Sequence, residues 1–400
     1  MPIRRDLLKG MASVTLAGLP FTRLTAGERP ADPAGPLPLH ALPGKKPLIR
    51  RSFRPPNLET PLEYFNELYT PNDAFFVRYH LAAIAQPDPR AWRLRIGGDA
   101  AGSPRELTLA ELQSDFEQVE VSAVNQCSGN RRGLFEPRTP GVQWGYGAMG
   151  NARWRGVRLR DLLDRVGVRK GALEVVCNGA DAGVLPGTPD FMKSIPVDKA
   201  RDGHTLVAVA MNGEPLPHWH GAPARLVVPG WTATYWVKHL TTIDVVTQPF
   251  DGYWMKTAYR VPSEAFPAAA RFASQHTAAN TPVTSVVVNS LITNVTAGQR
   301  FSAGADIKVA GIAWDAGSGI RTVEVSVDGG QQWHAAGLGE DAGGYSWRQW
   351  HHVFRPARPG SHRLMARATS RAGETQRTTL VANPGGYHHN LIQALDIEVG

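Results

Sequence analysis

A break in composition divides this 400-residue chain: Pro, Ala and Ser dominate between Tyr259 and about Asn280. After the break, short apolar runs recur at regular spacing, with Gly-rich turns such as Asp328-Gly329-Gly330 between them. Short strands at this spacing are typical of an immunoglobulin-like sandwich. We therefore predict an all-β domain over residues 270–400, with strands at 283–288, 306–314, 322–327, 351–354, 362–368 and 391–399.

The part before the break mixes strand and helix patterns. Residues 92–96 alternate between apolar and polar, as a half-buried strand does, and residues 107–116 have the pattern of a helix. Residues 231–246 are expected to continue the sheet that begins at 226–228. Further strands are expected at 75–80, 119–124 and 173–177. The predicted fold class is α+β, with mixed β-sheets and helices over residues 31–260 followed by the sandwich.

The first 30 residues have the pattern of a targeting segment. Ile3-Arg4-Arg5-Asp6-Leu7-Leu8-Lys9 contains paired arginines, and a mildly apolar stretch follows at 11–21. This pattern is typical of a twin-arginine export signal, and an N-terminal amphipathic helix is the alternative. We expect export to the periplasm by this route, which carries folded proteins and therefore suits a chain that binds a cofactor before export.

The charge of the chain argues against some classes of partner. The net charge is +8, and the positive residues are mostly dispersed arginines. Because no basic run interleaves with aromatic residues, we expect an anionic ligand site and a basic surface, and no binding to nucleic acid. No uninterrupted apolar run reaches the roughly 18 residues that a membrane span requires. No Cys-x-x-Cys-His motif is present, so we expect no haem in this chain.

One of the two cysteines lies in the segment Asn125-Gln126-Cys127-Ser128-Gly129-Asn130-Arg131-Arg132. Its small residues allow a tight loop, which would bring the thiol and two guanidinium groups to one cavity. Cationic neighbours favour the thiolate, the form that binds soft metals or attacks electrophiles. A cysteine on its own is more often a small buried hydrophobic residue. The functional reading therefore depends on the other residues of the chain.

Those other residues are further cationic side chains on separate segments. They are Arg78 with His80, His220 with Arg225, and Lys238 with His239. Taken singly, each has an ordinary reading, such as a core histidine or a surface arginine. Together with Cys127 they predict a site for a large anionic cofactor, with phosphate held by Arg and Lys and a soft metal held by the thiolate.

An ordered series of motifs resembles the sulfite oxidase family of molybdopterin enzymes, from about residue 60 to the end of the chain. The series comprises Phe76-Val77-Arg78-Tyr79-His80, the segment 125–132, Asn151-Ala152-Arg153-Trp154-Arg155-Gly156-Val157, Asn178-Gly179-Ala180-Asp181, Met211-Asn212-Gly213-Glu214-Pro215-Leu216-Pro217, His220-Gly221-Ala222-Pro223-Ala224-Arg225 and Val237-Lys238-His239-Leu240.

The resemblance implies a role for each matching residue. Cys127 would be the protein ligand of molybdenum. Arg78, Arg132 and Tyr259 would form a pocket for the substrate anion, lined by His80 and Trp144. The residues implied to bind molybdopterin are Phe76, Val77, Arg78, Tyr79, His80, Asp181, His220, Arg225, Lys238, His239 and Leu240.

The resemblance also implies an activity and partners. Sulfite would be oxidised to sulfate by oxygen-atom transfer at a mononuclear molybdenum centre. Nothing in the chain resembles the haem domain of animal members, so electrons would pass one at a time to an external c-type cytochrome. The C-terminal domain would form a homodimer, or the chain would pair with a haem subunit. An arginine that animal members contribute from this domain has no counterpart near 383–387.

Three other functions remain open on the sequence. The same cofactor could act on another small oxo substrate, such as a sulfoxide or nitrate. Cys127 could instead be a nucleophile paired with His80 or His220. In the third reading the chain is an exported binding module in which Cys127 and Cys177 form a structural disulfide.

Overall fold

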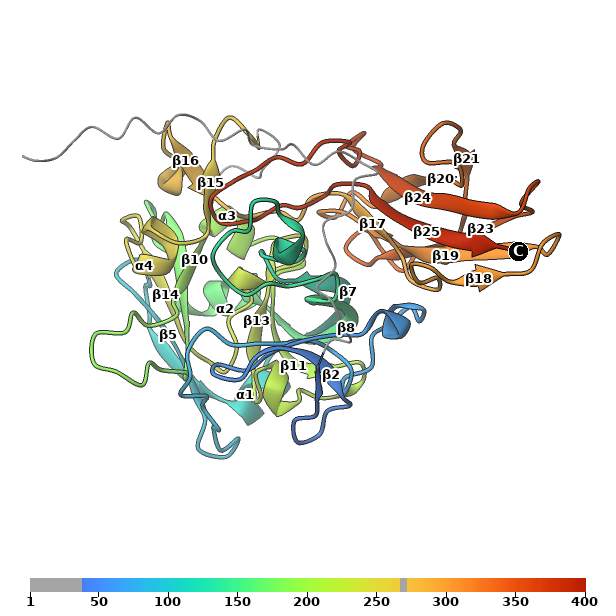
Figure 1. The fold of residues 1–400 in the computed structure, drawn as a ribbon. Helices are drawn as coiled ribbons and strands as arrows, with labels where there is room; N and C mark the ends of the chain where they lie inside the picture. Colours follow the sequence, from blue (N-terminus) through green and yellow to red (C-terminus); the bar gives the residue numbers. More distant parts are fainter. Residues whose placement is uncertain (1–37, 267–271) are drawn as a thin grey trace, which may run out of the picture.

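The computed structural model describes residues 38–266 and 272–400. The predicted export segment, residues 1–30, lies outside the described residues. Figure 1 shows a larger domain, coloured blue to yellow, from which an elongated orange and red domain extends. No described helix has both the length and the apolar character needed to cross a bilayer.

The described chain begins with an arm that lies across the larger domain. Its strands β1 (Leu39–His40), β2 (Leu48–Ser52) and β3 (Asn57–Glu59) form an antiparallel sheet with β4 (Val77–Arg78). The short 3-10 helix η1 (Leu62–Phe65) connects the arm to β4. The strand predicted at 75–80 is therefore present but shorter.

Two larger sheets form the body of this domain. One has the order β10-β9-β14-β5-β6 and the other the order β12-β11-β8-β7, with β13 paired to β11. The first comprises β5 (Arg93–Gly97), β6 (Arg105–Thr108), β9 (Glu174–Gly179), β10 (Lys193–Pro196) and β14 (Leu240–Val246). The second comprises β7 (Gln118–Gln126), β8 (Met149–Arg158), β11 (Leu206–Met211), β12 (Glu214–Pro215) and β13 (Arg225–Val227).

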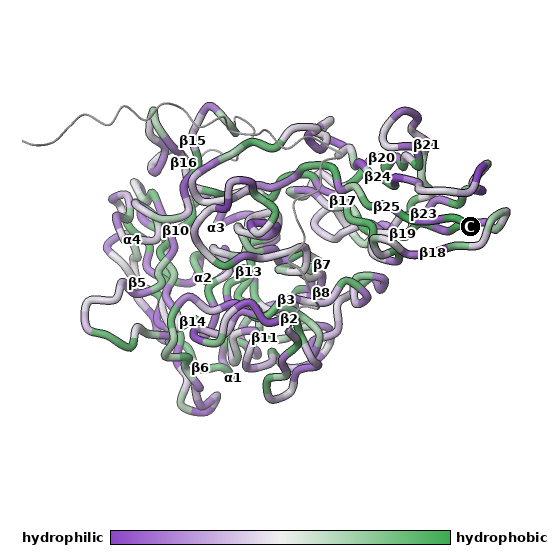
Figure 2. The backbone as a smooth tube through the Cα atoms, viewed as in Figure 1, coloured by the Kyte–Doolittle hydropathy of each residue, from purple (hydrophilic) through white to green (hydrophobic). Residues whose placement is uncertain are grey.

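The helices are short and cover the sheets. They are α1 (Leu109–Ser114), α2 (Leu159–Val166), α3 (Val197–Ala200) and α4 (Tyr253–Lys256), with the 3-10 turns η2 (Arg132–Leu134), η3 (His218–His220), η4 (Ala233–Tyr235) and η5 (Ala273–Gln275). The helix predicted at 107–116 is present but shorter: α1 starts at Leu109, because Thr108 at the end of β6 caps it and forms a reciprocal capping box with Glu111. In Figure 2 many of the hydrophobic stretches lie in the interior of the larger domain, and hydrophilic stretches occur on strands as well as in loops.

The prediction that residues 231–246 continue the sheet begun at 226–228 is wrong. β13 ends at Val227, and Pro229 follows, which has no backbone N–H for a ladder. The chain then turns at Gly230, with φ of 79°, and enters η4. β14 lies in the other sheet, parallel to β5 and antiparallel to β9. This crossing places residues 228–239 between the two sheets, where the site described below is found.

The C-terminal domain consists of two packed β-sheets, as predicted. One has the order β17-β19-β23-β22 and the other the order β18-β25-β24-β20-β21. The strands are β17 (Asn289–Ile292), β18 (Arg300–Phe301), β19 (Ile307–Trp314), β20 (Ile320–Ser326), β21 (His334–Ala335), β22 (Gly337–Leu338), β23 (Arg348–Phe354), β24 (Gly360–Ser370) and β25 (Gln393–Val399). The strand expected at 283–288 starts later, at Asn289.

The two domains share a hydrophobic core at their junction. Phe65, Val124 and Met149 of the larger domain pack with Trp314 and Trp347 of the sandwich. A two-stranded sheet of β15 (Arg260–Pro262) and β16 (Asn280–Pro282) leads from one domain to the other. The red segment that precedes β25 runs back over the larger domain in Figure 1. The C-terminal domain therefore reaches the site of its neighbour.

Candidate active site

The Cys127 loop follows directly on β7. The backbone N–H of Cys127 donates to the Ala148 carbonyl (2.9 Å), and the Ser128 hydroxyl donates to Thr232 Oγ1 (2.8 Å). The thiol is free and 7% exposed. Cys177 is also free, and it is fully buried on β9 in the core. The disulfide of the binding-module reading is therefore not formed.

Cys127 faces a pocket between the two large sheets, to which segments far apart in the chain contribute. Ten of the residues predicted from the sequence meet here. The lining consists of Phe76, Arg78, Tyr79, His80, Asn125, Cys127, Ser128, Asp181, Phe191, Trp219, His220, Arg225, Ala233, Thr234, Trp236, Lys238 and Tyr259.

Buried positive charge characterises one end of the pocket. Arg225 is 4% exposed and donates to the carbonyls of His220 and Trp236, both at 3.0 Å. Burial lowers the pKa of Arg225 to about 9. The pKa of Lys238 is also well below its usual value, because of burial and then the neighbouring Arg225, while Asp181 opposes the shift. Asp181 is the single acidic residue of the lining.

An anionic cofactor fits this end of the pocket. A buried cation without a counter-ion is costly, and a phosphate would supply both charge and hydrogen-bond acceptors. Arg225 Nε and Asn125 Nδ2 are buried and lack a hydrogen-bond partner in the described structure. Among the residues described, no group of three or more His, Cys, Asp or Glu side chains could hold a metal alone. A metal beside Cys127 would take further ligands from the cofactor.

The other end of the pocket combines Arg78 with aromatic side chains. The Tyr259 hydroxyl is hydrogen-bonded to His80 Nε2, and the His80 ring stacks on Phe191 with centroids 3.6 Å apart. Tyr259 has a φ of 58°, an unusual left-handed backbone for a bulky residue. The pKa of His80 is well below its usual value, because of burial and then the nearby cation of Arg78, so the ring is neutral.

Comparisons with known proteins agree with this geometry. Residues 80–254 match the oxidoreductase molybdopterin binding domain, and residues 280–399 match the Mo-co oxidoreductase dimerisation domain. The chain is 34% identical to sulfite oxidase of Gallus gallus over 341 residues, which span 82% of this chain and 72% of that protein. The chain belongs to the sulfite oxidase family of molybdopterin enzymes.

Two further comparisons concern a second sulfite oxidase and a solved structure of the same fold. It is 33% identical over 321 residues to the mitochondrial sulfite oxidase of Homo sapiens, covering 77% of this chain and 57% of that longer protein. The crystal structure of the sulfane dehydrogenase SoxCD from Paracoccus pantotrophus has the same fold, with a TM-score of 0.74 and 24% identity over 90% of this chain and 88% of that one. Both predicted domains thus have the architecture of a sulfite oxidase family member.

Five residues that the family resemblance singled out do not line the pocket: Val77, Arg132, Trp144, His239 and Leu240. Arg132 donates from Nε to the Gly385 carbonyl (2.8 Å). Trp144 is fully buried behind Phe76. His239 Nε2 lies 2.9 Å from the Tyr79 hydroxyl. Two of these side chains contact lining residues from outside the pocket: Trp144 packs on Phe76, and His239 is bonded to Tyr79. Arg132 contacts the C-terminal segment instead.

The lining includes seven residues that were not among the predicted site residues: Asn125, Ser128, Phe191, Trp219, Ala233, Thr234 and Trp236. Sequence reasoning also missed three side chains outside the lining that contact lining residues. Tyr387 stacks on Tyr259 with ring centroids 5.5 Å apart. Lys193 is fully buried on β10, with Nζ 5.3 Å from the centroid of the Tyr259 ring. Lys45 of the arm lies behind His220. Tyr387 falls in the segment that lacks the expected arginine, but no local pattern marks Lys45 or Lys193.

Proposed function

We propose that this chain oxidises sulfite to sulfate with molybdopterin bound in the pocket described above. The observation that supports it most is the free Cys127 thiol in the same pocket as the buried cations Arg225 and Lys238. A soft-metal ligand and a phosphate site are thus combined in one cavity. The family relatives named sulfite oxidase indicate the substrate class.

Each side chain has a proposed part in holding the cofactor. Cys127 would be the protein ligand of molybdenum. His220, Arg225 and Lys238 would bind the anionic groups of the cofactor, and Asp181 would help to hold the pterin. Bound molybdopterin would supply two-electron oxygen-atom transfer, so that sulfite and water give sulfate, two protons and two electrons.

The substrate end of the pocket attracts and orients a small oxyanion. Arg78 donates to Asn57 Oδ1 (3.1 Å) and to the Tyr79 carbonyl, which keep its guanidinium beside the pocket. Its charge would draw sulfite in and fix an oxygen of the anion. Because His80 is neutral, its Nε2 can accept a hydrogen bond from the Tyr259 hydroxyl, and Tyr259 would then be oriented as a hydrogen-bond partner for substrate or water.

The electron acceptor is proposed to be an external c-type cytochrome in the periplasm. The predicted twin-arginine segment at 1–30 supports this location. The dimerisation domain match at 280–399 supports an oligomer, either a homodimer or a complex with a haem subunit.

Metal analysis and steady-state kinetics test the proposal together. We expect one molybdenum per chain, and sulfite-dependent reduction of cytochrome c. Parallel assays with a sulfoxide and with nitrate, using a reduced viologen dye, test for the other oxo substrates. Molybdenum-replete protein without sulfite turnover would overturn the substrate, and activity in metal-free protein that a thiol reagent abolishes would overturn the cofactor role.

A further inference from the structure

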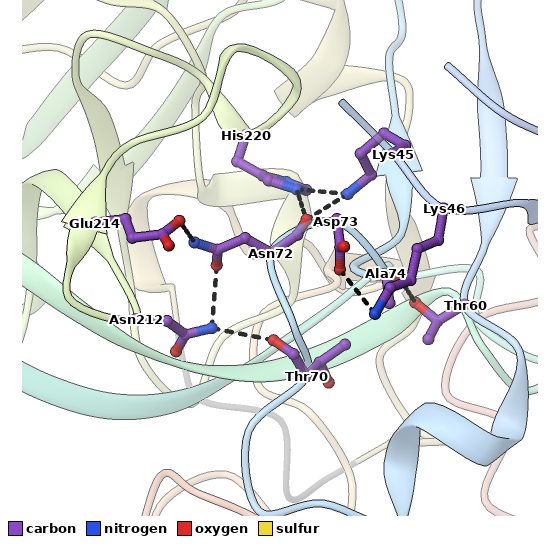
Figure 3. A network of polar contacts seen from close by, with 10 residues as sticks. All are labelled: Lys45, Lys46, Thr60, Thr70, Asn72, Asp73, Ala74, Asn212, Glu214 and His220. Atoms are coloured by element: carbon purple, nitrogen blue, oxygen red, sulfur yellow. Dashed lines mark hydrogen bonds and ion pairs between the residues drawn. The ribbon is translucent and has the colours of Figure 1, made fainter. Parts of the chain in front are cut away.

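Lys45 connects the N-terminal arm to a residue of the cofactor pocket. It follows the turn after β1, and its side chain is almost fully buried. Its Nζ donates to the Asn72 carbonyl (2.6 Å) and lies 2.9 Å from His220 Nε2. Figure 3 shows the ammonium group pointing at the His220 ring, with the Asn72 carbonyl completing a triangle. His220 in turn lines the pocket.

The arm is held against His220 by contacts on either side of Lys45. The Trp219 indole N–H donates to the Pro43 carbonyl (2.9 Å). Lys46 forms an ion pair with Asp73 (3.4 Å), and its backbone N–H donates to the Asp73 carbonyl (3.0 Å). The contacts of Pro43 and of the Lys46 backbone therefore hold the chain in place on both sides of Lys45.

Asn72, the shared partner of Lys45 and His220, is itself held in place. Its side-chain amide donates to the Met211 carbonyl and to Glu214 Oε2, both at 3.1 Å. Asn212 donates to Asn72 Oδ1 (3.0 Å), as Figure 3 shows. The carbonyl that receives the Lys45 ammonium is thus part of a rigid network, and Lys45 has little freedom to turn away from His220.

We propose that Lys45 is a positioning residue for molybdopterin, acting through His220. Lys45 Nζ and the Asn72 carbonyl both lie within hydrogen-bond distance of His220 Nε2, at 2.9 Å and 3.2 Å, and together they fix the orientation of the ring that lines the pocket. Burial lowers the pKa of Lys45 to about 7, and an anionic cofactor close to the ring would favour the charged ammonium form. This inference rests on the molybdopterin site and not on the proposed substrate.

The test measures how firmly the holoenzyme retains molybdenum. Lys45→Met keeps the aliphatic stem but removes the ammonium, and we expect about tenfold faster release of molybdenum into the filtrate during a fixed incubation, since one charge-assisted hydrogen bond is lost. Lys45→Arg should restore most of the retention. Lys46→Met is the matched control, because its side chain is 42% exposed and pairs with Asp73 away from the ring.

A double variant separates positioning from a merely structural role. If Lys45 acts through His220, the release rate of Lys45→Met with His220→Ala should equal that of His220→Ala alone. The KM for sulfite of the molybdenum-loaded fraction of Lys45→Met should equal that of the parent protein. Unaltered molybdenum retention in Lys45→Met, an equal loss in Lys46→Met, or additive losses in the double variant would overturn the proposal. If the variants retain molybdenum as expected but the parent protein does not turn over sulfite, only the proposed substrate is overturned.

Discussion

The two cysteines are both buried in the same hydrophobic core but differ in what they face. Cys127 follows the end of β7 and lines the pocket, whereas Cys177 on β9 does not. Burial raises the pKa of the Cys177 thiol far above its usual value, which keeps that sulfur protonated and unreactive. Position in the fold, and not residue type, therefore makes one sulfur a candidate ligand.

Replacing each cysteine should separate these roles. We expect Cys127→Ser to abolish sulfite oxidation while the unfolding temperature stays near that of the parent protein. We expect Cys177→Ala to keep molybdenum and turnover but to lose about 1–2 kcal/mol of unfolding free energy, because it leaves a small core cavity. Metal content and thermal melting of both variants provide the measurements. Turnover retained in Cys127→Ser would contradict the ligand assignment.

Arg78 is the charged side chain of the pocket beside the Tyr259 and His80 pair. For Arg78→Gln we expect KM for sulfite to rise about tenfold or more and kcat to change less, since the loss of an anion-binding charge mainly weakens substrate capture. Steady-state kinetics at several sulfite concentrations measure the split. Arg51→Gln, which alters an ion pair with Glu59 on the arm, is a control for general effects of removing an arginine. An unchanged KM in Arg78→Gln would exclude the role.

At the scale of elements, the segment that precedes β25 joins the C-terminal domain to the site. The Tyr387 ring stacks on the Tyr259 ring, and the Arg132 guanidinium is 5.2 Å from the Tyr387 centroid. Lys193 Nζ is 5.3 Å from the Tyr259 centroid. Tyr259, which has a left-handed backbone, is therefore packed against a side chain of the C-terminal domain and against one of β10. The C-terminal domain supports the site through an aromatic ring where the resemblance implied an arginine.

Removing the Tyr387 ring should leave the Tyr259 side chain less firmly positioned. We expect Tyr387→Leu to lower kcat about two- to tenfold, because an aromatic pair contributes roughly 0.5–1.5 kcal/mol. Tyr387→Phe keeps the stacked ring and should retain most of the activity. Kinetics at saturating sulfite, with molybdenum content as the reference, distinguish the two variants. Equal activities in Leu and Phe variants would show that stacking does not position Tyr259.

At the scale of the whole molecule, buried neutral histidines make stability depend on pH. Burial lowers the pKa of His388 to about 4 and that of His389 to about 3. In the unfolded chain both return to a pKa near 6.5 and take up protons at higher pH than the native protein does. As the pH falls below about 6.5, the unfolded state therefore binds protons before the native state does. The stability that the neutral histidines leave intact above pH 6.5 is lost progressively towards pH 4.

Urea unfolding should reveal this dependence. From pH 7 to pH 5 we expect each of these histidines to reduce the free energy of unfolding by about 1–2 kcal/mol. His389→Gln should flatten the profile by its share, whereas His351→Gln, at an exposed position on β23, should leave the slope unchanged. A slope that is the same in all three proteins would contradict the assignment.

The sequence by itself determined the two domains, the fold class and most of the pocket. Motifs such as 76–80, 125–132 and 220–225 are local, so one segment carries enough information to identify a pocket residue. The repeated short strands after residue 280 identify the sandwich for the same reason, since alternation and turn residues act within a few positions.

Only the tertiary structure decided which residues support the pocket. Lys45, Lys193 and Tyr387 are distant from the motifs in the chain, and their roles come from contacts with His220 and Tyr259 that no local pattern encodes. The tertiary structure likewise leaves Trp144 and Arg132 outside the lining, where Trp144 packs against Phe76 and Arg132 donates to the Gly385 carbonyl. Pairing of distant segments depends on the summed packing of the whole core, and no local pattern in the sequence reveals that sum.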